Sequence, residues 1–588
     1  VLLPQGFSIN IAFKQHYFLE EKYLRESLIG RRSDNAETIR PGPHTLNGSY
    51  TQLVLKWEEV DTKVTSAHVG DDLVILISPN SIPKNRVKVI LETGMLWNRK
   101  GTLHRDRHSL TARTPGQLIK VYTTSPIVDD DPYLDINTPY ISVWLNGEIG
   151  ISTGKPRTLD EIKIAIQAQK KILNQEADKF GTLADAYIAI QAGIAWNLIY
   201  EPKHDRVVST VGRLWNEEYG GYCLFGWDNF FLSYVTALFS KDLAYSNIID
   251  HLHGKTENGF IPNDNRGNGS KSFDRSQPPV GSIMVKEIYK AYPSEWFLRA
   301  VFDDLLAWNR WWKRERNNEG LLSYGSSPAK NPFHEPVFGT KTAAGYESGM
   351  DDSPMYEGVP YNKNKKTLEL QDVGLNSLYI ADCKALAEMA GILGRDDEKD
   401  ELLERAEHFS FNMNELWNDE IGIFLNYRTD LDAFSKRLSP TIFYPLLAEI
   451  VPKQKSVRIL DHFYDTNKFY GKWMLPSTSR DDPSFKKQRY WKGAIWPPLN
   501  FLTYLSLKKA RHYGASTELS EKSLHLFLEE WFRKGFVSEN YSSISGTGDA
   551  SNLSSDRFHS WGTLFGIMSF MEKGYLPRTE TSLIEPEH

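Results

Sequence analysis

The spacing of apolar residues changes once along the chain, near residue 155, and this change constrains the fold most. Before it, apolar side chains recur mostly at every second position, as in residues 51–57, 72–77, 87–91 and 140–145. This alternation is typical of strands with one buried face. After it, the period is close to the 3.6 residues of amphipathic helices. The sequence therefore predicts a multidomain chain, with an antiparallel β-sandwich in residues 1–155 and an all-α domain in residues 156–588.

The helical part opens with a clear start signal. Thr158 and Glu161 have the spacing of a capping box, in which each side chain satisfies a free backbone N–H of the first turn. About twelve helical segments follow from the apolar period. The clearest are expected near residues 182–200, 294–314, 372–392, 396–416, 497–512, 517–534 and 560–573.

A weak internal repeat organises these helices. Related turns combine Gly with aromatic or aliphatic residues, and the strongest pair is Leu-Trp-Asn-Glu-Glu at 214–218 and Leu-Trp-Asn-Asp-Glu at 416–420. About six such turns among about twelve helices predict a ring of six helical hairpins, an (α/α)6 barrel. Chance similarity among common turn residues would give the same pattern. In a ring, equivalent turns meet on one face, so residues far apart in sequence would converge on one cavity.

Charge and composition exclude several classes of protein. The 69 Lys and Arg against 75 Asp and Glu leave a net charge of −6, whereas a nucleic-acid-binding protein normally carries a basic excess. The longest charge-free apolar stretch, Ala186 to Tyr200, falls short of the ~20 apolar residues of a membrane span. The 2 cysteines, Cys223 and Cys383, exclude a disulfide framework. We expect both to be buried thiols.

Cofactor and compartment are less constrained. Asp129, Asp130 and Asp131 precede Pro132 at the edge of the expected sandwich, where a solvated loop or a structural Ca²⁺ site would fit. No cofactor is expected to be required. The chain begins Val-Leu-Leu-Pro, so we expect no signal peptide and a processed or truncated start. A soluble protein is expected, either cytoplasmic or periplasmic or secreted after removal of a leader, and the sequence leaves its oligomeric state open.

Two carboxylates in turn regions are the candidate reacting groups. Asp351 lies in a loop bounded by Gly349 and Pro354, and Glu539 lies in the last of the related turns. Glycosidic cleavage uses such a pair, because one carboxyl must protonate the leaving oxygen while the other is ionised. A separation of ~6.5–9.5 Å admits a water molecule and inverts the configuration of the sugar. A single carboxylate in a loop is otherwise a helix cap or a solvated turn.

Several short motifs, taken in order, resemble one family. Glu-Ser-Gly-Met-Asp at residues 347–351 is similar to the general-acid motif of glycoside hydrolase family 63 and of the related trehalases. Segments that resemble substrate-pocket motifs of the same group are residues 226–228, 259–263, 276–279, 490–498 and 555–562. The resemblance implies an (α/α)6 catalytic barrel, an inverting mechanism and α-glucoside or related substrates. Family members with a β-sandwich before the barrel are typically glucosidases, and smaller relatives hydrolyse mannosylglycerate or glucosylglycerate.

The same resemblance implies a role for each matching residue. Asp351 would be the general acid and Glu539 the general base. The residues that would bind the sugar are Trp227, Asp228, Gln277, Trp491, Lys492, Trp496 and Trp561. Asp and Gln can exchange hydrogen bonds with hydroxyl groups, and indole faces can stack on a pyranose. Lys492 stands where an Arg is expected, and its ammonium group lacks the planar fork with which a guanidinium makes bidentate contacts. His559 stands where Tyr is more usual.

The expected function is an inverting exo-acting hydrolase of α-glucosidic bonds in short oligosaccharides or glucosides. A hydrolase of mannosylglycerate or glucosylglycerate and a non-catalytic carbohydrate-binding protein are the alternatives, although the presence of both carboxylates favours an enzyme. A metal-binding Asp-Asp motif is disfavoured, because Tyr356 rather than an acid stands four residues after Asp352. Asp351→Asn and Glu539→Gln are each expected to lose activity with an unchanged melting temperature.

Overall fold

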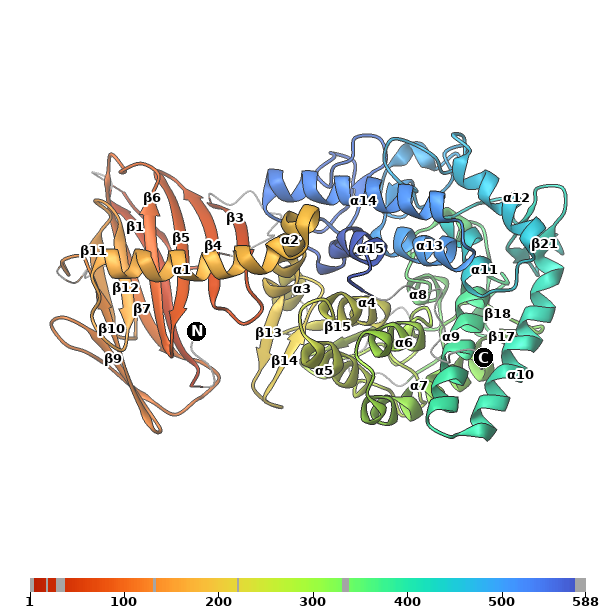
Figure 1. Ribbon diagram of the computed structural model, residues 1–588, viewed down its shortest axis with the longest axis horizontal. Helices are drawn as coiled ribbons and strands as arrows, with labels where there is room; N and C mark the ends of the chain where they lie inside the picture. Colours follow the sequence, from red (N-terminus) through yellow and green to blue (C-terminus); the bar gives the residue numbers. More distant parts are fainter. Residues whose placement is uncertain are drawn as a thin grey trace. The chain divides into compact units, whose positions relative to one another are not determined.

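The structure, a computed structural model, describes residues 5–16, 20–27, 37–128, 130, 134–218, 221–329 and 338–576. The chain forms two compact units. The first comprises Val1–Trp196, Glu201–Arg206 and Lys534–Phe536, and the second comprises Asn197–Tyr200, Val207–Arg533 and Val537–His588. The first unit carries the large sheets and the second carries most of the helices (Figure 1).

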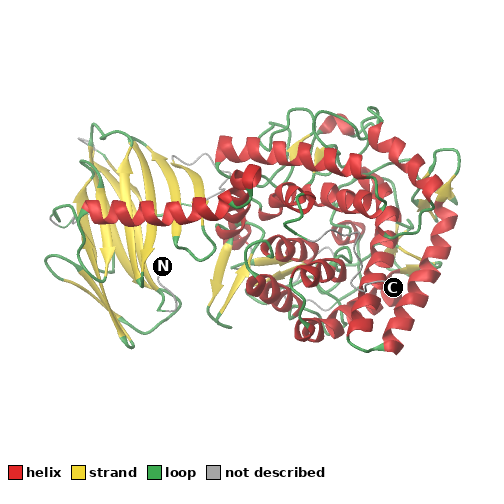
Figure 2. Ribbon diagram, in the orientation of Figure 1, coloured by secondary structure: helices red, strands yellow, loops and turns green. Residues whose placement is uncertain are grey.

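Two antiparallel sheets form the first unit (Figure 2). The smaller has the strand order β11-β7-β1-β2 and the larger the order β3-β4-β5-β6-β12-β10-β9-β8. The strands are β1 (Phe7–His16), β2 (Glu21–Leu24), β3 (Glu37–His44), β4 (Tyr50–Trp57), β5 (Val60–Val69), β6 (Asp72–Pro79), β7 (Arg86–Met95), β8 (Thr102–Arg105), β9 (Leu110–Thr114), β10 (Gln117–Thr123), β11 (Tyr140–Trp144) and β12 (Ile149–Thr153). The four segments expected from their alternation lie in β4, β6, β7 and β11.

Side chains of both sheets share one apolar core. The smaller sheet contributes Phe13, Val89 and Val143, and the larger contributes Trp57 and Ile77. Alternate residues of several strands point into this core, among them those of β6 and β7, which is why the period of two is visible in the sequence. The antiparallel, sheet-rich character expected of the N-terminal part is confirmed.

Helix α1 (Leu159–Asp178) covers the other face of the larger sheet. The backbone N–H of Glu161 donates to Thr158 Oγ1 at 3.2 Å, and Glu161 Oε2 accepts from the Thr158 N–H at 2.7 Å, so the capping box is present. The stripe formed by Ile162, Ile166 and Leu173 packs on side chains of β4, β5 and β6. The first unit continues through α1 and α2 (Ala184–Ala195) to Trp196. The domain boundary expected at residue 155 stays a prediction.

The second unit is predominantly helical. Its helices are α3 (Arg213–Glu218), α4 (Gly226–Thr236), α5 (Lys241–Leu252), α6 (Gly281–Ala291), α7 (Glu295–Arg316), α8 (Lys341–Glu347), α9 (Val373–Ile392), α10 (Asp396–Met413), α11 (Tyr444–Leu447), α12 (Lys453–Tyr464), α13 (Pro497–Lys509), α14 (Tyr513–Lys534) and α15 (Leu564–Glu572). Short two-stranded ladders join several of them.

Six of the described helices pack one on the next. Helix α4 contacts α6, α6 contacts α9, α9 contacts α11, α11 contacts α13, α13 contacts α15, and α15 contacts α4 (Figure 1). Almost every residue of α4, α13 and α15 is buried. Helices α5 and α10 pack on α4 and α9 respectively. The helical character expected of the C-terminal part is confirmed.

The strongest repeat does not fold alike in its two copies. Residues 214–218 lie in helix α3, whereas Trp417–Asn418 forms β21 and pairs with β22 (Ile423–Phe424). The expectation that both copies are equivalent turns is therefore wrong. Five residues carry too little information to specify a conformation, and packing with the rest of the chain decides it.

Three expectations about composition can be compared with the described residues. Cys223 and Cys383 are free and buried, as expected. Within these residues, no helix has both the length and the apolar character to cross a membrane, and no cluster of three or more His, Cys, Asp or Glu could hold a metal ion. Of the possible Ca²⁺ loop, Asp129 and Asp131 lie outside the described residues, and Asp130 accepts a hydrogen bond from Arg105.

Candidate active site

One cavity of the helical unit gathers most of the motif residues. Its volume is about 250 Å³, a little below the ~300–1,000 Å³ of pockets for drug-sized ligands. The expected site residues that line it are Trp227, Asp228, Gln277, Asp351, Trp491, Trp496, Glu539 and Trp561. It is also lined by Trp215, Phe225, Asn263, Asp264, Arg266, Arg275, Tyr346, Gly349, Tyr490 and His559. Segments from residue 215 to residue 561 thus meet at one place.

Lys492 is the expected site residue that the structure does not bring into the cavity. Its Nζ donates to Asp352 Oδ2 at 2.5 Å, outside the cavity lining. Sugar binding by Lys492 therefore has no support from its position.

The N-terminus of α4 joins three of the motifs. The Gly226 N–H donates to Asn263 O at 2.9 Å, and the Trp227 N–H donates to Gln277 Oε1 at 2.9 Å. Behind them, His251 Nε2 lies 2.9 Å from Gly226 O. The first N–H groups of a helix have no partner within the helix, so Asn263 and Gln277 satisfy them. The first turn, which carries Trp227 and Asp228, is fixed by this arrangement.

Asp228 is another carboxyl group of the cavity, which Asp264, Asp351 and Glu539 also line. Burial raises its pKa well above the usual range, and the charges of Glu539 and Asp351 raise it further. A neutral carboxyl can donate as well as accept a hydrogen bond. Asp228 can therefore offer both functions to a sugar hydroxyl.

The loop that carries Asp351 is anchored by a buried ion pair one turn earlier. Glu347, the last residue of α8, accepts from Arg316 Nε at 2.7 Å and Arg316 Nη2 at 2.8 Å. It also accepts from the backbone N–H groups of Ser276 at 3.0 Å and Gly325 at 2.6 Å. Both members of the ion pair are fully buried. The start of the loop therefore has a single well-defined position.

Gly349 lets this loop approach the tryptophan of α4. Its φ is +68°, a conformation that favours glycine. A Cβ there would lie 2.7 Å from Trp227 Cζ2. The loop therefore lies directly on one wall of the cavity.

The environment of Asp351 suits a proton donor. Burial and then the charge of Asp352 raise its pKa from 3.8 to about 7, against the hydrogen bond that its Oδ2 accepts from the Tyr490 hydroxyl at 3.3 Å. A carboxyl with a pKa near 7 still holds its proton in a large fraction of molecules at neutral pH. General acids in enzymes are commonly tuned in this way.

Glu539 is held by backbone and side-chain donors. Its Oε2 accepts from the Asp556 N–H at 3.1 Å and from Asn540 Nδ2 at 3.2 Å. Its own carbonyl accepts from Trp561 Nε1 at 2.9 Å. Nearby, β25 (Ala494–Ile495) pairs with β26 (Tyr541–Ser542) and joins this segment to the 490–498 motif. The carboxylate is therefore oriented in the cavity, and Glu539 is only 8% exposed.

Four tryptophans form the aromatic part of the wall. Trp491 and Trp496 stack with ring centroids 3.6 Å apart and an interplanar angle of 7°. Trp561 meets Trp496 edge-on at 5.6 Å and Trp227 at 6.2 Å. His559 lies 4.7 Å from Trp561. The rings thus pack on one another and also line the cavity. They can therefore stabilise the fold and offer a surface to a ligand.

Sequence reasoning missed several residues that line the cavity. Tyr490 is part of a quoted motif, yet no individual role was expected for it. Arg275 directly precedes the motif at 276–279, and its guanidinium lies 5.3 Å from the Tyr346 ring and bonds to Asp274 Oδ1 at 2.8 Å. Arg266 Nε donates to Asp264 Oδ2 at 2.7 Å. Adjacency to the motifs is the one sequence signal that could have pointed to Arg275 and Tyr490.

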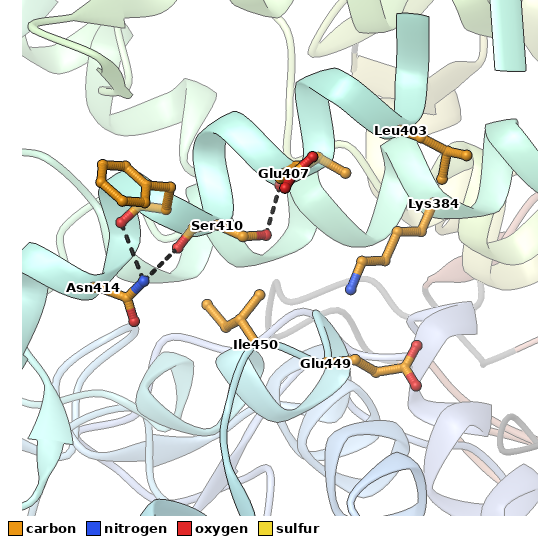
Figure 3. Close-up of a pocket in the computed structure, with 9 residues that line it drawn as sticks. Lys384, Leu403, Glu407, Ser410, Asn414, Glu449 and Ile450 are labelled. Atoms are coloured by element: carbon orange, nitrogen blue, oxygen red, sulfur yellow. Dashed lines mark hydrogen bonds between the residues drawn. The ribbon is translucent and has the colours of Figure 1, made fainter. Parts of the chain in front are cut away.

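A second hollow, with a volume of about 540 Å³, lies between α9, α10 and the chain at Glu449 and Ile450 (Figure 3). The Asn414 amide donates there to the carbonyls of Ser410 and Phe411, both at 3.2 Å. None of the motif residues lines it. Its greater size therefore does not make it the better candidate site.

Known proteins are similar to the helical part of the chain. The family model for the mannosylglycerate hydrolase MGH1-like glycoside hydrolase domain matches residues 221–561, more than half of the chain. Mannosylglycerate hydrolase MGH1 of Selaginella moellendorffii is 22% identical over 378 residues, which are 55% of this chain and 76% of the relative. Glucosylglycerate hydrolase of Mycolicibacterium hassiacum is 22% identical over 369 residues, 47% of this chain and 78% of the relative.

Part of the fold also has a solved counterpart. An uncharacterized conserved protein from Thermus thermophilus is 19% identical and superimposes with a TM-score of 0.50. The match covers 59% of this chain and 93% of that chain. From the extent of the family match, together with the ordered motifs, the chain belongs to glycoside hydrolase family 63, among its MGH1-like members.

Proposed function

We propose that the protein is an inverting, exo-acting glycoside hydrolase that cleaves α-glucosidic bonds of short oligosaccharides or glucosides. Asp351 is the general acid and Glu539 is the general base. The observation that carries this proposal is the pair of carboxyl groups on one cavity, with the pKa of Asp351 raised to about 7. One member can then hold a proton at a pH at which an ordinary carboxyl has lost it.

In the proposed reaction, Glu539 and Asp351 each carry out one proton transfer. Glu539 takes a proton from a water molecule, whose oxygen attacks the anomeric carbon from the face opposite the leaving group. Asp351 gives its proton to the glycosidic oxygen as the bond to the anomeric carbon breaks. Asp228 and Gln277 bind hydroxyl groups of the sugar, and the tryptophan wall packs on its apolar face. The configuration at the anomeric carbon is inverted in one step.

The architecture belongs to the same proposal. The closed succession of packed helices from α4 to α15 supports an (α/α)6 barrel in residues 156–588. The two sheets with a common core support a β-sandwich in residues 1–155. A cavity of about 250 Å³ supports exo action on a single terminal sugar unit.

A neutral substrate is favoured because the cations of the cavity are already paired. Among the residues that the structure describes, Arg266 and Arg275 are the arginines that line it, together with the carboxyl groups of Asp228, Asp264, Asp351 and Glu539. Both arginines already form ion pairs, with Asp264 and Asp274. An anionic leaving group such as a glycerate would have to compete with these carboxylates.

A glycosylglycerate hydrolase is the second candidate. The names of the two curated relatives point to such substrates, and the Arg266 side chain is 27% exposed and lines the cavity. Binding of a carboxylate by Arg266 would require a rearrangement of its pair with Asp264. A glycerate conjugate would then be cleaved in preference to a neutral glucoside.

Proton NMR of the enzyme with α-linked glucose disaccharides, mannosylglycerate and glucosylglycerate separates these candidates. Release of β-glucose from an α-linked disaccharide is the expected result and reports inversion directly. Loss of a glycerate conjugate alone would favour the second candidate. Release of α-glucose would contradict the inverting mechanism. Binding of sugars without turnover would indicate a non-catalytic protein.

Two isosteric variants test the roles of the carboxyl groups. Asp351→Asn cannot donate the proton and Glu539→Gln cannot accept one, so each should lower kcat by ~10²–10⁴. Circular dichroism and substrate-analogue binding check that the fold and the sugar site remain. Activity close to that of the wild type in either variant would remove that residue from its proposed role.

A further inference from the structure

Asp352 follows the proposed general acid and joins its loop to another segment of the site. Its Oδ2 accepts from Lys492 Nζ at 2.5 Å, and its Oδ1 accepts from the Trp491 N–H at 3.1 Å. The Asp352 and Lys492 side chains are 36% and 21% exposed. Neither residue lines the cavity. An ion pair therefore lies immediately beside the reacting carboxyl, outside the space for the sugar.

The segment that binds Asp352 also binds Asp351. The Tyr490 hydroxyl donates to Asp351 Oδ2 at 3.3 Å, so consecutive carboxyl groups of one loop bond to consecutive residues of the other. The receiving segment is a tight turn, in which the Lys492 N–H donates to Arg489 O at 3.0 Å. Tyr490 has a φ of +51°, which is rare for a residue other than glycine. Strained positions of this kind persist where the surroundings hold them firmly.

Gln488 supplies that support below the turn. Its side chain is buried, and its Nε2 donates to Phe485 O at 3.0 Å and to Gly493 O at 3.1 Å. Its Oε1 accepts from the Ser543 N–H at 2.9 Å. The turn is thereby fixed to the segment that follows Glu539. The ion pair of Asp352 thus connects the acid loop to a firmly held platform.

Several charged or titratable groups face Asp351. Asp352 raises its pKa, second only to burial, whereas Tyr490 and Arg275 lower it. Asp228 and Glu539 line the same cavity. The charge of Asp352 is itself paired to a cation outside the cavity, Lys492. A substitution of Lys492 would therefore change the electrostatic effect of Asp352 on Asp351, and it would not remove any group that lines the cavity.

We propose that Asp352 and Lys492 are positioning residues of the general acid. Their ion pair fixes the loop that carries Asp351, and the charge of Asp352 favours retention of the proton that Asp351 must deliver. The inference rests on the proposed role of Asp351. It also accounts for Lys492, which follows the cavity-lining Trp491 and yet does not line the cavity itself.

Two substitutions should act in opposite directions. Asp352→Asn removes a like charge, so Asp351 loses its proton more readily and the alkaline limb of kcat/KM moves down by roughly half to one pH unit. Lys492→Gln leaves the charge of Asp352 uncompensated, so the limb moves up by a similar amount while kcat falls. Lys492→Arg keeps a cation beside Asp352. The pH of its alkaline limb and its kcat should therefore stay close to the wild-type values. Loss of packing alone would not shift the limb in opposite directions.

Infrared difference spectroscopy provides a readout that needs no substrate. Spectra of each protein minus those of its Asp351→Asn counterpart, recorded across pH, give the titration midpoint of the Asp351 carboxyl. The midpoints should move as the alkaline limbs do. If no glycoside is hydrolysed, the proposed function fails, and these midpoints still decide whether Asp352 and Lys492 control the proton of Asp351.

A matched control is the Lys468–Asp481 ion pair, whose members are 25% and 45% exposed and do not line the cavity. Lys468→Gln should leave both the midpoint and the alkaline limb at their wild-type values. Equal midpoints in the wild type, Asp352→Asn and Lys492→Gln would overturn the inference, as would shifts of both variants in the same direction.

Discussion

Asp351 is an ionisable side chain that the fold buries, and its burial has a cost in stability that depends on pH. Burial and Asp352 raise its pKa from 3.8 to about 7, so the folded protein retains this proton over a pH range in which the unfolded chain has released it. Between these two pKa values the folded state binds more protons, and stability therefore falls as pH rises. Above about pH 7 the stability has fallen by the full amount that the raised pKa of Asp351 implies.

Asp351→Asn should therefore melt at a higher temperature than the wild type at pH 8 and at a similar temperature near pH 4. The amide has no charge to desolvate, and the wild-type carboxyl is protonated at the lower pH. Scanning calorimetry at the two pH values measures the difference. Asp461→Asn, an exposed position on α12, serves as the control. Equal melting temperatures at pH 8 would support the unchanged stability expected from sequence and contradict the cost of burial.

Individual residues also show how far sequence reasoning reaches. The Glu539 turn has no local signal of chemistry, so its place on the cavity could be expected only through the family resemblance and the ring of turns. Sugar binding is expected of Lys492 only because it is expected of its neighbours in the motif. In a tight turn, however, adjacent side chains point in different directions, so Trp491 lines the cavity while Lys492 meets Asp352.

At the scale of elements, predictability follows the contrast between buried and exposed faces. Helix α1 has one buried side, formed by Ile162, Ile166, Leu173 and Ala177, and the period of its apolar residues is clear in the sequence. Helix α4 is buried along its whole length, so it has no exposed face and gives a weak periodic signal. This helix nevertheless carries Trp227 and Asp228. The elements nearest the site were thus among the hardest to delimit from sequence.

The ion pair between Arg316 and Glu347 links the end of α7 to the end of α8. Removing one partner of a fully buried pair leaves a charge without compensation and typically costs ~3–5 kcal/mol. Arg316→Met should lower the free energy of unfolding by about this amount at pH 8. It should also lower kcat, because Glu347 anchors the loop of Asp351. Chemical denaturation and steady-state kinetics measure the two effects.

Arg299→Met is the control for this prediction, because it removes an exposed ion pair with Glu295 on the same helix. Its expected cost is only ~0.3–0.5 kcal/mol, with kcat unchanged. If both variants lost the same small free energy, the buried pair would not contribute to the position of the acid loop.

At the scale of the whole molecule, the pattern of the sequence locates a change of secondary structure but not the limits of a compact unit. The apolar period changes near residue 155, whereas the first unit includes α1, α2 and the distant segment Lys534–Phe536. The period reports which side of an element is buried, and it carries no information about which unit buries it. The return of the chain at Lys534–Phe536 therefore had no signal in the sequence.

Gly535 lies in that returning segment, four residues before Glu539. Its φ is +76°, and a Cβ there would lie 2.0 Å from Pro41 O and 3.1 Å from Arg40 Cγ. A backbone carbonyl cannot yield as a flexible side chain can, so Gly535→Ala should displace the segment. Overpacking of this kind costs ~1–3 kcal/mol. Because Val537 begins the segment that carries Glu539 in the second unit, kcat should fall as well.

Gly574→Ala isolates the steric contribution, since Gly574 has the same φ of +76° and no atom within 4 Å of the added Cβ. The backbone conformation alone should cost ~1–2 kcal/mol at either position. Thermal denaturation should therefore show a larger loss for Gly535→Ala, and kinetics at 25 °C should show a lower kcat for that variant only. Equal losses of stability with full activity in both would mean that the returning segment does not contribute to the position of the proposed base. A loss of kcat in Gly535→Ala alone would instead show that the returning segment helps to position Glu539. The change of apolar period in the sequence gives no indication of this role.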